Sequence, residues 1–214
     1  MDVMTDFELD IYYQIEKMVA DFDANIDSIR KLLHDVSINR NFGEQLIYSD
    51  IGMSNNRQRR MLLFVVMLNE SSNLQEDWHT AYYLLKEAYL MSDNIYAQLL
   101  NNPYDFDLHL YLRQMQKHID VDKMMEEDEL DFLNSMTYPV TVYRGMCNKE
   151  FESECFGISW SDDKEVAEKY VFFSKNNNTE KDGKVVRIDV PRDRVFAAWG
   201  VKGKKKEMII LYKE

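Results

Sequence analysis

Apolar residues recur at steps of three and four in the first part of the chain, which is the spacing of an amphipathic helix. One such stripe runs over residues 11–33 and predicts a long helix that ends near His34. Thr5 and Glu8 open it with a capping-box pattern, in which each side chain accepts from the other residue's unpaired backbone N–H. The N-terminal part of the chain is therefore expected to begin with a helix of about 30 residues.

The same periodicity returns after residues 35–56, whose glycines and Ser-Asn cluster predict loops and one short helical turn. The apolar run 61–68 fits a buried strand or a buried helix, and its helical neighbours favour the helix. Asp122 can cap the last helix of the series. Together these helices predict a bundle of about five. Those after residue 56 are expected over residues 57–69, 76–100, 108–119 and 122–136.

After Pro139 the pattern changes to short β-branched runs, which indicate strands. One helix interrupts them, with Ser161 or Asp162 as its expected cap. The apolar face of this helix is expected to carry Val166, Ala167, Tyr170 and Phe173. The strands are expected over residues 140–143, 185–190, 195–198 and 208–212.

The charge changes at the same place. Residues 1–138 hold 11 basic and 25 acidic residues, a balance of −14, whereas residues 139–214 hold 15 and 13, a balance of +2. The change from helical periodicity to β-branched runs and the change in charge together predict an α+β fold, with an acidic helical lobe (1–138) followed by a small mixed or antiparallel β-rich core (139–214). The acidic lobe would repel a nucleic-acid backbone, so a nucleic-acid target is less expected than a protein target. Its acidic face either aids solubility, docks on a basic partner or imitates nucleic acid.

Several classes of protein are disfavoured by what the chain lacks. The apolar run 61–68 is far shorter than the roughly 20 residues that span a bilayer. The N-terminus has no signal-peptide pattern, and two cysteines do not form a disulfide framework, so we expect a cytoplasmic protein without a membrane partner. The four histidines lack the spacing of a metal site, so no metal is expected. Neither a Rossmann fingerprint nor a P-loop is present.

Candidate chemistry lies in the last third of the chain. Arg144 follows an apolar strand, where its guanidinium offers a planar fork to a phosphate or carboxylate, and Gly145 would let a ligand approach the backbone. Ser159 and Ser161 point the same way along a strand, with Trp160 opposite. A lone glutamate, Glu207, opens the apolar terminal strand. Each residue also fits a structural explanation: a surface ion pair, a helix cap or an exposed strand end.

In this order the residues resemble the ADP-ribosyltransferases of the arginine–serine–glutamate type, as found in bacterial toxins and bacteriophages. The resemblance covers about residues 138–212, and the helical part resembles only loosely the lobe that precedes the catalytic core in many members. Its motifs are the arginine motif Tyr143-Arg144-Gly145, the serine strand Gly157-Ile158-Ser159-Trp160-Ser161, the pair Ala167-x-x-Tyr170, the loop Val195-Phe196-Ala197-Ala198-Trp199, and the glutamate strand Glu207-Met208-Ile209-Ile210.

The resemblance implies an NAD-dependent mono-ADP-ribosyltransferase, a glycosyltransferase that consumes NAD as a substrate and needs no metal. Arg144 would hold the NAD pyrophosphate or the backbone around it, and Ser159 would brace the ribose pocket and position Glu207. Glu207, the catalytic glutamate, would bind the ribose 2′-hydroxyl and stabilise the oxocarbenium-like state, while Tyr170 would stack on the nicotinamide. The residues implied in NAD binding are Tyr143, Arg144, Gly145, Ser159, Trp160, Ser161 and Tyr170.

One position departs from the family. Members that modify arginine often carry Glu or Gln two residues before the catalytic glutamate, where this chain has Lys205. Arginine is therefore disfavoured as the acceptor. Two alternatives to a protein-modifying transferase stay open: a non-enzymatic binding or inhibitor protein on a degenerate transferase scaffold, which would use its acidic helical face, and an NAD glycohydrolase.

Overall fold

The computed structural model describes residues 40–41, 43–44, 60–92, 95–100, 104–177, 183–200 and 207–211. The helix expected over residues 5–34 and the position of Lys205 lie outside this part of the chain. The chain divides into two compact units, an N-terminal unit (residues 1–106) and a C-terminal unit (residues 107–214). Helices occur together with small antiparallel sheets, which agrees with an α+β class.

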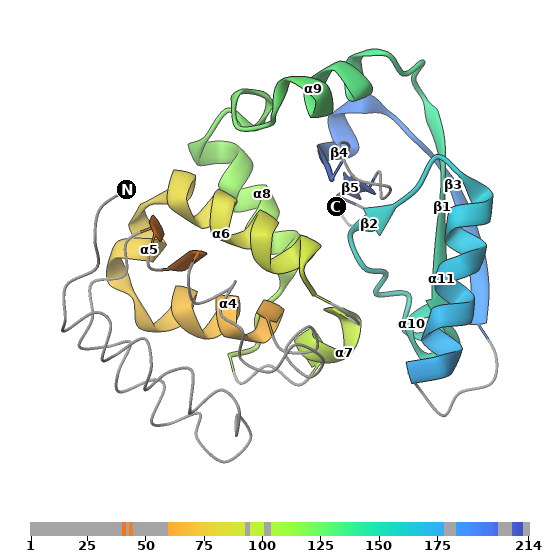
Figure 1. Ribbon diagram of the computed structural model, residues 1–214, viewed down its shortest axis with the longest axis horizontal. Helices are drawn as coiled ribbons and strands as arrows, with labels where there is room; N and C mark the ends of the chain where they lie inside the picture. Colours follow the sequence, from red (N-terminus) through yellow and green to blue (C-terminus); the bar gives the residue numbers. More distant parts are fainter. Residues whose placement is uncertain are drawn as a thin grey trace. The chain divides into compact units, whose positions relative to one another are not determined.

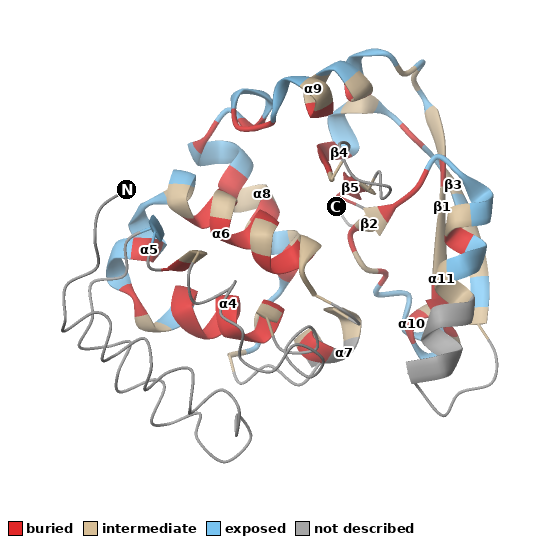
Figure 2. Cartoon of the chain, viewed as in Figure 1, coloured by how far each residue is buried: buried red, intermediate tan, exposed pale blue. Residues whose placement is uncertain are grey.

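The N-terminal unit is helical where the structure describes it. Beyond residue 59 its helices are α4 (Arg60–Glu70), α5 (Ser72–Glu76), α6 (Trp78–Leu90) and α7 (Ile95–Leu100). Every residue over 61–68 is buried, and Figure 2 shows α4 in red along this stretch. The helical interpretation of this run is confirmed, and burial on all sides explains why it has no polar face. The single helix expected over 76–100 is instead divided, because α6 ends at Leu90.

The C-terminal unit begins earlier than the change in composition at residue 138. It contains α8 (Leu108–His118), the 3-10 turn η2 (Val121–Lys123) and α9 (Glu127–Asn134), which the sequence pattern grouped with the helical lobe. The reason is packing, since α9 and η2 contact the buried strand β4 (Val195–Trp199). At this junction the Ala198 N–H donates to the Met125 sulfur at 3.4 Å.

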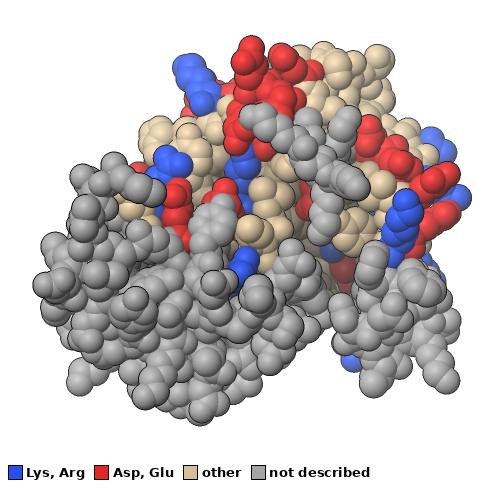
Figure 3. All heavy atoms as spheres, viewed as in Figure 1, with Lys and Arg blue, Asp and Glu red and all other residues tan. Residues whose placement is uncertain are grey.

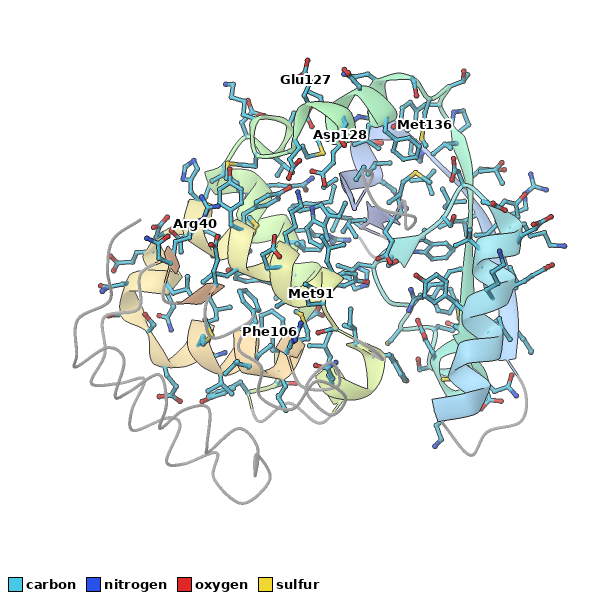
Figure 4. The ribbon with its side chains drawn as sticks, viewed as in Figure 1. Arg40, Met91, Phe106, Glu127, Asp128 and Met136 are labelled. Carbon is cyan, nitrogen blue, oxygen red and sulfur yellow. The ribbon has the colours of Figure 1, made fainter. Side chains whose placement is uncertain are left out.

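The start of α9 differs from the prediction that Asp122 caps this helix. Asp122 lies inside η2, and α9 begins at Glu127, where the Glu126 N–H donates to Glu129 Oε2 at 3.1 Å. Three acidic residues occupy the first turn, where negative charge complements the helix dipole. Glu127 and Asp128 are labelled on this turn in Figure 4, and Figure 3 shows acidic side chains gathered at the top of the view, where α9 lies. No helix among the described segments is both long and apolar enough to cross a membrane.

Two small antiparallel sheets form the centre of the C-terminal unit. Strand β1 (Val140–Cys147) pairs with β3 (Gly183–Val190), and a second sheet has the order β2-β5-β4, with β2 at Ser159–Trp160 and β5 at Glu207–Ile210. A backbone bridge between Tyr143 and Ser161 links β1 to the end of β2. Strands are found in all four predicted regions, and their pairing is antiparallel throughout the described part of the chain. The last strand, predicted to end at residue 212, ends at Ile210, and residue 212 lies outside the described residues.

Helix α11 (Lys164–Asn177) packs along β1 and β3, as Figure 1 shows. Its expected caps, Ser161 and Asp162, lie too early. The Ser161 hydroxyl accepts from the Asp163 N–H at 3.1 Å in a local turn. The side chain at the start of the helix is instead that of Asp163, whose Oδ1 accepts from the Glu165 N–H at 2.8 Å. The short helix α10 (Asn148–Ser153), which the sequence pattern did not predict, follows β1 directly.

Substituting Gly145 by alanine is expected to destabilise the C-terminal unit by about 3 kcal/mol, because overpacking forces the backbone to shift. A Cβ at this position would lie 1.9 Å from the carbonyl oxygen of Ala167 in α11, and a backbone atom cannot rotate away. Urea unfolding of Gly145→Ala and the wild type measures the difference. A loss below about 0.5 kcal/mol, the usual range for surface changes, would contradict this packing.

Asp77 caps α6, and its contribution to the free energy of unfolding depends on pH. The Thr80 hydroxyl donates to Oδ2 at 2.6 Å and the Thr80 N–H to Oδ1 at 3.0 Å, which holds the pKa of Asp77 below its ordinary value of 3.8. Since the folded pKa is depressed, the stabilisation is present above pH 3.8 and is lost as the pH falls through the folded pKa.

Asp77→Ala is therefore expected to lower the free energy of unfolding by about 1 kcal/mol at pH 7, and by progressively less as the pH falls below that of an ordinary aspartate. Denaturant unfolding at a series of pH values measures this difference. Asp77→Asn is the matched control, because its amide oxygen still accepts from the Thr80 N–H without titrating. A penalty for alanine that does not change with pH would show that the charge of Asp77 adds nothing to the cap.

Candidate functional site

Three strand positions bring together the arginine, serine and glutamate that the sequence singled out. Arg144 lies within β1, Ser159 begins β2 and Glu207 begins β5. Because Ser159 pairs with Ile209 in antiparallel register, Glu207 lies diagonally across from Ser159 on the same face of the sheet. A long side chain spans that diagonal, so the register itself places the carboxylate beside the serine.

The carboxylate of Glu207 is held by two hydroxyl groups from different elements. The Ser159 hydroxyl donates to Oε2 at 2.9 Å, and the Tyr170 hydroxyl, from α11, donates to Oε1 at 3.2 Å. All three residues are half-buried, so the group lies at the surface of the C-terminal unit rather than inside it. Each oxygen of the carboxylate thus has its own donor.

Arg144 connects the two sheets through its guanidinium. Its Nη1 donates to the Ser159 carbonyl oxygen at 2.6 Å, and its Nε donates to Glu150 Oε1 at 2.7 Å. Only 16% of the Arg144 side chain and 5% of the Glu150 side chain are exposed. Hydrogen bonds between charged groups shielded from water are stronger and more directional than exposed ones.

Glu150 is the site residue that the sequence did not reveal. It lies on α10 and is buried, whereas Glu152 and Glu154 beside it are exposed, so its charge alone gives no signal. The same Oε1 that accepts from Arg144 also accepts from the Gly157 N–H at 2.7 Å. A Cβ at Gly157 would lie 2.3 Å from Arg144 Nη2, so a larger residue there would displace the guanidinium.

Tyr143 and Gly145 do not join this group. They alternate with Arg144 along β1, so their side-chain positions face away from it. Gly145 was expected to admit a ligand, but the space beside its Cα is filled by the backbone of Ala167 in α11. The backbone of Tyr143 exchanges two hydrogen bonds with Ser161, at 2.7 and 2.9 Å. Both residues therefore contribute to the framework that places Arg144.

Trp160 and Ser161 also have framework roles. Trp160 is 1% exposed and packs edge-on against Phe156, with ring centroids 6.3 Å apart. Ser161 is buried, and its hydroxyl accepts from the Asp163 N–H ahead of α11. Of the seven residues implied in NAD binding, the structure brings Arg144, Ser159 and Tyr170 to the Glu207 carboxylate or to its supports.

Comparison with known proteins finds no matching family model, no matching curated protein and no matching solved structure. Among the residues with described positions, no group of three or more His, Cys, Asp or Glu side chains is arranged to hold a metal ion. The functional interpretation rests on the hydrogen-bonded group of Arg144, Glu150, Ser159, Tyr170 and Glu207.

The pairing of Arg144 with Glu150 is testable through stability. Arg144→Met is expected to lower the free energy of unfolding by about 3 kcal/mol, because a buried carboxylate is left without its partner. The double variant Arg144→Met/Glu150→Met is expected to lose less than about half of that, since replacing both charges removes the uncompensated one. Equilibrium unfolding of the single and double variants supplies the comparison. Strictly additive losses would show that the two side chains do not depend on each other.

Proposed function

We propose that the chain is an NAD-dependent mono-ADP-ribosyltransferase that modifies a protein target and releases nicotinamide. The observation that carries this proposal is the Glu207 carboxylate, which two hydroxyls orient at a half-buried position, one on each oxygen. A carboxylate has about four acceptor positions, so two donors leave capacity for a further hydroxyl. The residues around it are in the order that the resemblance to the arginine–serine–glutamate transferases implies.

Glu207 would supply the chemistry. Its carboxylate would accept a hydrogen bond from the 2′-hydroxyl of the nicotinamide ribose and stabilise the positive charge that develops on that sugar. Nicotinamide leaves with the electron pair of the bond between its ring nitrogen and C1′, and the acceptor nucleophile forms the new bond to C1′ and loses its proton. A negative group held in advance where positive charge develops is the arrangement that lowers such a barrier.

Ser159 and Tyr170 fit supporting roles. Both donate to Glu207, so they fix the plane of its carboxylate before substrate arrives. Tyr170 also presents an aromatic ring next to the carboxylate, which is compatible with stacking on nicotinamide, the role that the resemblance implies. An oriented side chain saves the entropy of ordering it during the reaction.

Arg144 fits the second of the two roles implied for it. Its hydrogen bonds to Glu150 and to the Ser159 carbonyl favour a guanidinium that braces the backbone around NAD over one that binds the pyrophosphate directly. The acceptor is proposed to be a protein side chain other than arginine, because Lys205 replaces the second acidic or amide residue found in arginine-modifying members.

Glu207→Gln is expected to lower the rate of nicotinamide release from NAD by about 10²–10³-fold, the usual effect of removing one preorganised electrostatic contact. The fold should persist, because glutamine keeps the size of the side chain. Glu168→Gln on α11, where the side chain is 53% exposed, is the matched control and should keep wild-type turnover. Unchanged nicotinamide release by Glu207→Gln would remove Glu207 from the mechanism.

Incubation with NAD labelled in its ADP-ribose part, together with a cell lysate, separates the transferase from the two alternatives. Label on a protein supports the transferase, whereas free labelled ADP-ribose alone would indicate an NAD glycohydrolase. A non-enzymatic binding protein would release no nicotinamide. If it also lacks an NAD site it would show no thermal shift with NAD, whereas a ligand bound at 100 times its Kd adds about 2.7 kcal/mol of stability.

A further inference from the structure

Glu150 makes contacts that neither the sequence pattern nor the proposed chemistry requires. Its Oε1 accepts from Arg144 Nε and from the Gly157 N–H, both at 2.7 Å. Its side chain is 5% exposed. A carboxylate so far removed from water needs charged or polar partners, and each of its two partners here leads directly to Ser159.

The first connection runs through the guanidinium of Arg144. This group is planar and rigid, so fixing Nε against Glu150 also fixes the direction in which Nη1 points. Nη1 donates to the Ser159 carbonyl oxygen at 2.6 Å. Glu150 therefore determines where Arg144 can hold the backbone of Ser159. Without this acid, the hydrogen bond and ion pair that orient Nε would be lost.

The second connection runs along the chain itself. Gly157 stands two residues before Ser159, and its N–H is bound to the same carboxylate oxygen. Segment 157–159 is thus held at its start by Glu150 and at its end by Arg144. The Ser159 hydroxyl at the end of this segment donates to Glu207 at 2.9 Å. A shift of the segment would move that hydroxyl away from the carboxylate.

We propose that Glu150 is a positioning residue, which holds Arg144 and segment 157–159 so that the Ser159 hydroxyl stays aligned with the Glu207 carboxylate. Its consequence for catalysis rests on the proposed function, whereas the holding of segment 157–159 does not. Glu150 itself reaches no reacting group in this scheme. It acts on Glu207 only through Arg144 and Ser159.

The first test compares Glu150→Ala with Glu152→Ala, which removes the same side chain from an exposed position on α10. Alanine is chosen because the oxygen of a glutamine could still accept from both Arg144 and the Gly157 N–H. In Glu150→Ala, kcat for nicotinamide release is expected to fall about tenfold, because small misplacements of catalytic groups are costly, while the KM for NAD changes less than about twofold. Glu152→Ala should match the wild type. In a Ser159→Ala background, Glu150→Ala should cause no further loss of kcat, because the hydroxyl that Glu150 positions is already absent. An equal loss in both backgrounds would overturn the proposed path.

The second test needs no reaction. Amide hydrogen exchange over residues 157–161 is expected to accelerate in Glu150→Ala and to stay at the wild-type rate in Glu152→Ala. Unchanged exchange in Glu150→Ala would overturn the holding role even if NAD turnover stands. If the wild type releases no nicotinamide, the proposed function fails, and the exchange result still decides whether Glu150 holds the segment. Should Glu150→Ala not fold, Glu150→Asp takes its place, because it keeps the charge but shortens the side chain by one methylene.

Discussion

The guanidinium of Arg144 is the constraint on which the C-terminal unit depends. It projects from one sheet, donates to the backbone of the other, and is neutralised by a buried acid from the helix between them. Buried ion pairs contribute little net stability, because removing two charges from water offsets most of their attraction. The hydrogen bonds of the pair are directional, however, because the planar guanidinium must point Nε at Glu150 and Nη1 at the Ser159 carbonyl oxygen at the same time. This pair is better understood as fixing geometry than as stabilising the fold.

Glycines make that geometry possible on both faces of β1. On one face, Gly145 lets the backbone of α11 approach the strand, and α11 carries Tyr170. On the other face, Gly157 leaves room for the guanidinium of Arg144. Strand alternation keeps the two faces separate, so helix packing and arginine placement do not compete for the same space. A larger side chain at either glycine would disturb a different support of the same glutamate.

The sequence predicted what depends on local pattern and missed what depends on tertiary contact. Runs of β-branched residues located the strands, and Arg144, Ser159 and Glu207 stood in a recognisable order. Glu150 could not be found, because its neighbours are equally acidic and only packing distinguishes it. The boundary at residue 107 was missed for a similar reason, since the apolar face of a helix does not say which partner covers it. Gly145 was expected to admit a ligand because a glycine in the sequence shows only that something lies close to the backbone. The sequence does not show whether that neighbour is a ligand or, as here, the backbone of a helix.

The two hydroxyls at Glu207 explain why a helix and a strand must both reach one carboxylate. The last torsion of a glutamate side chain has a broad, two-fold preference, so a single hydrogen bond leaves the carboxylate plane free to rotate. Ser159 constrains one oxygen from β2, and Tyr170 constrains the other from α11. Two donors on one element would move together, and a shift of that element would carry the carboxylate with it. Donors on separate elements fix the plane only when both the sheet and the helix are in place, which makes the orientation of Glu207 a property of the folded unit as a whole.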